Sequence, residues 1–105
     1  MPALENSGPL WTQDQAIAFE AALEAVNDVI AGYSEQIDAE ENGLQPNPAR
    51  VAWLNMRIDQ ATEIMHSLDV IDTANVQQVL VEYSAMVRAR DANQADKAPR
   101  WASRG

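Results

Sequence analysis

A chain of 105 residues with no cysteine and a formal charge of −9 is expected to form one domain without disulfides or thiolate chemistry. The charge is unevenly distributed, because residues 1–49 hold nine carboxylates and no Lys or Arg, whereas residues 50–105 hold seven groups of each sign. Such a field repels polyanions and attracts basic surfaces, so we expect a positively charged protein partner and no binding to nucleic acid or membranes.

Residues 1–11 predict a loose leader, because they contain Pro2, Gly8 and Pro9 and no periodic apolar pattern. The leader has neither a basic start nor an apolar stretch of signal length, and nowhere do about 18 apolar residues run together. With cysteine also absent, we expect an unprocessed cytoplasmic protein.

The first predicted helix covers Thr12–Glu41 and opens with a capping box, Thr12 to Gln15. Its apolar residues recur at spacings of three and four, a heptad-like seam over about 44 Å. We expect the helix to end at Asn42-Gly43 in a left-handed cap closed by Leu44. The seam residues are Ala16, Phe19, Leu23, Val26, Ile30, Tyr33 and Ile37.

The second predicted helix covers Asn47–Leu68, with Asn47 as its N-cap and Pro48 as its first residue. The short turn before it predicts an antiparallel hairpin with the first helix. Trp53 lies on the flank of the seam and is expected to pack between helices. The seam residues are Val51, Leu54, Ile58, Ala61, Met65 and Leu68.

The third predicted helix covers Thr73–Ala92 and is capped by Asp72 or Thr73. The fold class is therefore all-α: a three-helix bundle built on a long antiparallel hairpin, with one domain over residues 12–92 and a mobile basic tail over residues 93–105. The apolar set of this helix is Val76, Val79, Leu80, Tyr83, Met86 and Val87.

Five carboxylates of the first helix fall within an arc of about 80° and form an acidic stripe on the side away from the seam. Like charges one turn apart destabilise a helix by about 0.2–0.5 kcal/mol each. Two interpretations remain: a solvated face that keeps the chain soluble, or a docking face for a basic protein surface. The stripe consists of Glu20, Glu24, Asp28, Glu35 and Asp38.

The tail places Arg100 and Arg104 on either side of Trp101, which makes Trp101 a candidate anchor for a partner pocket. The alternatives are a disordered end, or a tail that folds back on the acidic face of its own chain. Of the other two tryptophans, Trp11 is expected to staple the entrance of the first helix.

Enzyme motifs are nearly absent, so we expect no catalytic activity and no cofactor. The exception is Glu63 and His66, whose spacing is used by di-metal sites in four-helix bundles; both project away from the seam. A di-metal enzyme is therefore the least favoured of three hypotheses.

The leading hypothesis is a small acidic binding protein that occupies or inhibits a basic partner, as an immunity protein, antitoxin or nucleic-acid mimic does. The alternative is a helical assembly module that self-associates. Because the first helix exceeds the other two by about 14 Å at 1.5 Å per residue, part of its seam is expected to stay uncovered, which favours a homodimer.

Overall fold

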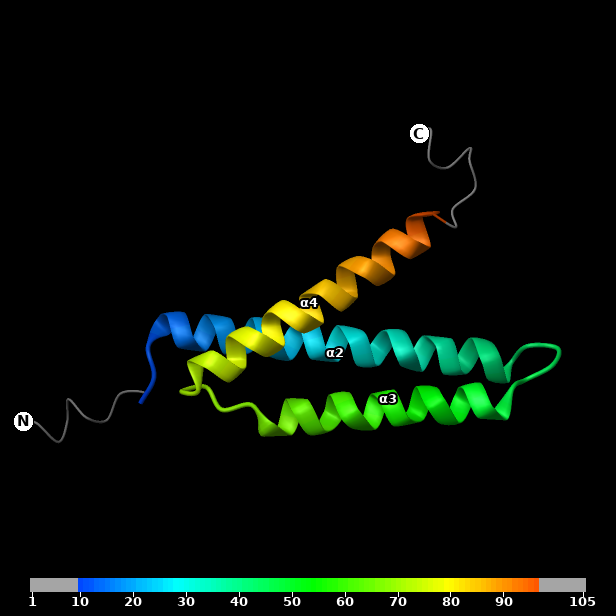
Figure 1. The fold of residues 1–105 in the computed structure, drawn as a ribbon, viewed down its shortest axis with the longest axis horizontal. Helices are drawn as coiled ribbons and strands as arrows, with labels where there is room; N and C mark the ends of the chain where they lie inside the picture. Colours follow the sequence, from blue (N-terminus) through cyan, green and yellow to red (C-terminus); the bar gives the residue numbers. More distant parts are fainter. Residues whose placement is uncertain (1–9, 97–105) are drawn as a thin grey trace, which may run out of the picture.

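The computed structural model describes residues 10–96, which form three helices: α2 (Gln13–Glu41), α3 (Pro48–Ser67) and α4 (Thr73–Asp96) (Figure 1). α2 and α3 run antiparallel, and α4 returns across α2, so the predicted all-α three-helix bundle is confirmed. The predicted leader, apart from its last two residues, and residues 97–105 with Trp101 lie outside the described residues.

All three helix starts follow from local capping chemistry. The Thr12 hydroxyl accepts a hydrogen bond from the Gln15 amide at 3.0 Å, and the Gln15 side chain accepts from the Thr12 amide at 2.8 Å. At α3 the Asn47 side chain accepts from the amides of Ala49 and Arg50. At α4 the Asp72 carboxylate accepts from the Asn75 amide at 3.2 Å. Each of these side chains satisfies backbone N–H groups that a helix end leaves unpaired.

α2 ends at Glu41, as predicted, but the predicted form of its cap was wrong. Asn42 ends α2 at φ −95° and ψ 4°, no described glycine has positive φ, and Leu44 is fully exposed, so neither the left-handed cap nor its apolar closure forms. Instead the Asn42 side-chain amide donates to the Asp38 carbonyl at 2.9 Å. α4 continues four residues beyond the predicted Ala92, because nothing in that stretch breaks a helix before Pro99.

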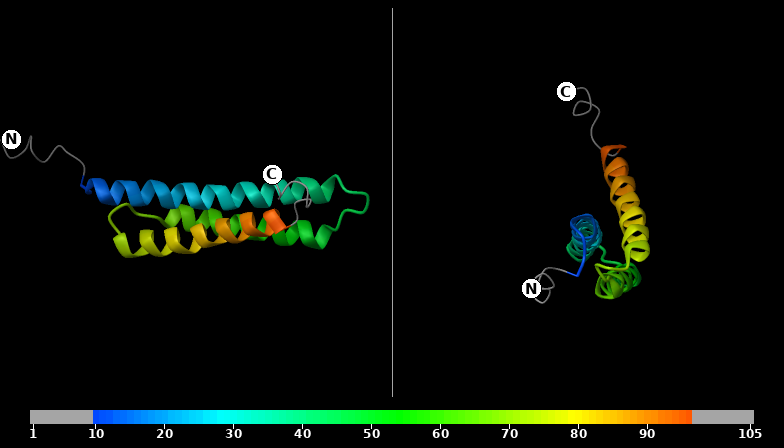
Figure 2. Two further views of the ribbon diagram at one scale, coloured as in Figure 1. Left: turned by 90° about the horizontal axis from the view of Figure 1, so that it is seen from above. Right: turned by 90° about the vertical axis from the view of Figure 1, so that its left-hand side faces the viewer.

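α2 is the central helix, and α3 and α4 each pack mainly against it rather than against one another (Figure 2). The predicted seam faces α3. A second face of small side chains, including Ala21, Ala25 and Gly32, receives α4. The buried hydrophobic residues among those described are few, and most of them form one cluster where the three helices meet. They are Ala22, Val26, Val29, Leu54, Ala61, Val76 and Val79.

The packing is open at the end of α4. α4 diverges from the hairpin toward its C-terminus (Figure 1). Consequently most apolar residues of the seams are half-buried rather than enclosed. No described helix is long and apolar enough to cross a membrane.

Candidate interaction surfaces

The five side chains of the acidic stripe are all exposed on α2. Four of them form no ion pair with any described residue. The fifth, Asp28, is paired with Arg90 of α4: the Arg90 Nη1 atom lies 3.2 Å from the Asp28 carboxylate and 3.0 Å from its carbonyl oxygen. From its sequence, the stripe was expected to have no compensating base. The structure corrects this, because folding brings Arg90 to Asp28 from 62 residues away.

Arg90 reaches Asp28 because Gly32 has no side chain in its path. A Cβ atom on Gly32 would lie 2.9 Å from Nη1 of Arg90 and 3.3 Å from its Cδ. Hydrogen bonds to Asp91 and Asp28 raise the pKa of the Arg90 guanidinium, which is fully charged in any case. Arg88, two residues before Arg90, lines the same α2–α4 furrow as Glu24 and Asp28.

One end of the molecule carries carboxylates but none of the described bases. Residues 10–27 and 58–87, which form the end where the three helices converge, contain no Lys or Arg. We call this the groove end. The four described bases, Arg50, Arg57, Arg88 and Arg90, lie outside these ranges, with Arg57 and Arg88 directly at their borders. Its eight carboxylates are Asp14, Glu20, Glu24, Asp59, Glu63, Asp69, Asp72 and Glu82.

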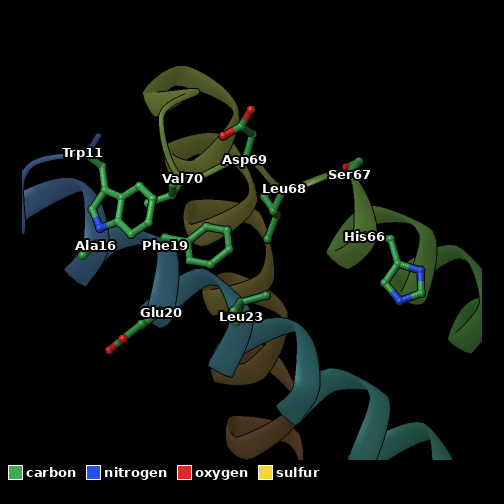
Figure 3. A pocket seen from close by; sticks show the side chains of 10 residues that line it. All are labelled: Trp11, Ala16, Phe19, Glu20, Leu23, His66, Ser67, Leu68, Asp69 and Val70. Carbon is green, nitrogen blue, oxygen red and sulfur yellow. The ribbon is translucent and has the colours of Figure 1, made fainter. Parts of the chain in front are cut away.

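The groove end contains the largest described cavity, an open groove of about 750 Å³ between the start of α2 and the α3–α4 connection (Figure 3). Phe19 and Leu23 of α2 and Leu68 and Val70 of the connection form its apolar floor, and Trp11 forms one wall. Figure 3 shows the carboxylates of Glu20 and Asp69 turned outward on different sides of this floor. The remaining lining residues are Ala16, His66 and Ser67.

The groove exists because α3 is shorter than α2. α2 has 29 residues and α3 has 20, so the first turns of the α2 seam extend past the end of α3. The expected uncovered part of the seam is thus where the groove lies. The sequence predicted the difference in helix length, but not the cavity that this difference produces.

At the opposite end, where α2 turns into α3, the arginines bond to side chains of the same chain. The Arg50 Nε atom lies 3.4 Å from the Glu40 carboxylate, and the Arg50 Nη2 atom donates to the Gln36 side chain at 3.0 Å. Arg57 donates to the Tyr33 hydroxyl at 3.3 Å and lies 5.9 Å from the ring centre of Tyr33. We call this the hairpin end.

Two of the three tryptophans are described. Trp53 is 46 % exposed, so the prediction that it packs between helices was wrong. Its ring meets the Tyr33 ring edge-on at 6.3 Å, and Arg57 covers it at 5.9 Å from the ring centre, which keeps it on the flank of the hairpin. Trp11 is 41 % exposed and lies at the entrance of α2, as predicted, where it also lines the groove.

Comparison with models of protein families, with curated proteins and with solved structures found no match.

The described residues offer little catalytic chemistry. Glu63 and His66 are both exposed, and no group of three or more Asp, Glu or His residues within 10–96 is placed to hold a metal ion. Burial raises the pKa of the Tyr83 hydroxyl, with Arg57 acting in the opposite direction, which makes Tyr83 a poorer proton donor than a free tyrosine. The surfaces best developed for function are therefore the acidic stripe and the groove.

Proposed function

We propose that this chain is a non-enzymatic acidic protein that binds a basic surface of another protein through the acidic stripe. The observation that carries the proposal is that Glu20, Glu24, Glu35 and Asp38 are exposed on one side of α2 and have no ion-pair partner among residues 10–96. Repulsion along the stripe weakens the helix, and a helix selected for stability alone would include Lys at these positions.

The charge density of the stripe bears on the kind of partner. Its five carboxylates extend over 18 residue steps, about 27 Å, or one charge per about 7 Å. One strand of B-DNA carries a phosphate every 3.4 Å or so along its axis, about twice that density. The spacing therefore supports an inhibitor or immunity-type contact with a basic protein groove better than close imitation of a nucleic acid.

The test compares two variants with the same net charge. In the stripe variant, Glu24, Glu35 and Asp38 become Lys; in the control, Asp59, Glu63 and Glu82 on α3 and α4 become Lys. Each changes the formal charge from −9 to −3. Asp28 is left unchanged because its reversal also removes the contact with Arg90.

Immobilised wild-type protein and both variants are used to capture proteins from host lysate at low and high salt, and the association rate of a captured protein is then measured. We expect the stripe variant to lose the partner and the control to retain it, with association slowed about tenfold or more and dissociation changed less. Equal binding by both variants, or equal loss, contradicts a docking role for the stripe.

Self-association is the second candidate function, and a separate observation favours it. The described surface exposes several large apolar side chains that a monomer leaves in contact with water. These are Leu10, Trp11, Ile17, Leu44, Trp53, Met56, Ile71 and Val81. Measurement of molar mass across a wide concentration range tests it, and a constant 11.6 kDa contradicts it.

A further inference from the structure

We propose that the groove binds the segment Lys97–Gly105 of a second copy of this chain, with Trp101 inserted over the apolar floor. The groove shares Glu20 with the acidic stripe, but the proposal needs none of the three residues reversed in the stripe variant, so it is tested separately from the proposed function. It assigns one occupant to the groove and one role to the basic segment.

The apolar part of the groove suits an aromatic anchor. Phe19, Leu23 and Leu68 are half-buried and form its floor, and Trp11 offers a ring at its wall. The volume of about 750 Å³ exceeds what one indole ring needs and leaves room for the adjoining backbone. A tryptophan that enters such a site covers apolar surface and can stack against an aromatic neighbour.

The charge around the groove suits a basic occupant. Glu20 and Asp69 line the groove, and the whole groove end lacks Lys and Arg. The segment Lys97–Gly105 has the opposite composition, since Lys97, Arg100 and Arg104 are accompanied by no Asp or Glu side chain. Two of these bases flank Trp101, so an inserted indole places a cation on each side of it, toward the acidic rims.

The direction of α4 bears on whether the segment comes from the same copy or from a second one. α4 starts three residues after Val70 of the groove and carries Asp96 away over 24 residues, about 36 Å at 1.5 Å per residue. Trp101 follows Asp96 by five residues, which span at most about 18 Å when fully extended. Because α4 leads this segment away from the groove of its own chain, we assign the tryptophan to a second copy.

The experiment measures self-association of full-length chains by sedimentation velocity from micromolar to millimolar concentration. We expect the wild type to associate, and association to weaken as salt rises, because exposed charges are screened. Trp101→Ala and Trp11→Ala should each weaken association by about tenfold or more. Trp53→Ala is the matched control, since Trp53 is similarly exposed but lies at the hairpin end, and it should leave association unchanged.

A second measurement locates the contact. A synthetic peptide of residues 97–105 is added to isotopically labelled full-length Trp101→Ala protein, whose groove is intact, and amide and indole NMR signals are followed. We expect shifts of the Trp11 indole and of the Phe19 and Leu23 amides, and none when the peptide carries Ala in place of Trp101.

Four outcomes overturn the proposal. They are a wild type that stays monomeric at millimolar concentration, association that survives Trp101→Ala, equal loss with Trp11→Ala and Trp53→Ala, and peptide-induced shifts confined to other surfaces. The second and fourth would show that copies meet through another face. None of the four bears on the stripe variant described above, so the two proposals fail separately.

Discussion

The groove end and the hairpin end of this molecule are built from the same helices but treat their polar groups differently. At the hairpin end, Arg50 pairs with Glu40, and Arg57 bonds to Tyr33 and covers Trp53. At the groove end, residues 10–27 and 58–87 hold eight carboxylates and no Lys or Arg, and apolar side chains line an open cavity. The hairpin end pairs its polar side chains within the molecule, whereas the groove end leaves its carboxylates and apolar side chains available to a ligand.

Truncating one leucine at each end tests this difference most strongly. Leu54 is fully buried in the hairpin, so Leu54→Ala should lower the free energy of unfolding by about 2–5 kcal/mol. Leu23 is half-buried and lines the groove, so Leu23→Ala should cost only about 1 kcal/mol. Urea unfolding followed by circular dichroism measures both. Equal losses would mean that the groove is closed in solution.

Reversing the charge of a carboxylate should change the stability of the fold in opposite directions at the two ends. Glu40 pairs with Arg50 and accepts a hydrogen bond from the Asn47 amide at 3.1 Å, so Glu40→Lys should destabilise the fold by about 1 kcal/mol. Glu20→Lys removes repulsion with Glu24 one turn later and should stabilise by about 0.2–0.5 kcal/mol.

Thermal unfolding at low salt measures both reversals, with Glu41→Lys as the control beside Glu40. Glu41 is exposed and makes no ion pair among the described residues, so its reversal should not destabilise. If Glu20→Lys proves as harmful as Glu40→Lys, the carboxylates of the groove end have partners after all.

The contact between Gly32 and Arg90 marks the boundary between the two ends. In an Arg90→Ala background, Gly32→Ala should stabilise by about 0.5–1 kcal/mol, because alanine favours a helix over glycine and the three atoms nearest to its Cβ, all of Arg90, are gone. In the wild type the gain should be smaller by about 0.5 kcal/mol or more, since Arg90 must leave Asp28. Equal gains in both backgrounds would show that the contact is not maintained.

The smallest effect concerns pH and Tyr83. Because its pKa is raised in the folded state, the folded chain holds this proton more tightly than the unfolded chain does. Stability should therefore fall as pH rises above the ordinary tyrosine pKa of about 10, and remain unaffected below it. Urea unfolding between pH 9 and 11 should show a smaller decline for Tyr83→Phe. The same decline in both proteins would assign it to other groups.

Local signals account for what the sequence predicted well. Thr12, Asn47 and Asp72 cap helices through hydrogen bonds to amides two or three residues away, so their positions follow from short motifs. The cap at the end of α2 does not follow from a short motif, because Glu40 bonds to the Asn47 amide and to Arg50 across the turn. The positions of the three helices along the chain were also predicted, from their apolar periodicity.

The interaction surfaces were only partly predictable. The exposure of the acidic stripe followed from helical geometry, but the Asp28–Arg90 pair joins residues 62 positions apart. The site for α4 could have been suspected from the small residues Ala21, Ala25 and Gly32 on one side of α2. The groove depends on where α3 ends relative to α2, which sequence indicates only as a difference in length.

The separation of bases from the groove end makes the molecule an electric dipole along its length. The N-termini of α2 and α4 lie at the groove end and add only about half a positive charge each, far less than its eight carboxylates. A dipolar particle rotates in a field before it touches the source. At low ionic strength this protein should approach a positively charged surface with the groove end first, leaving the loop 42–47 facing solvent and open to an added protease.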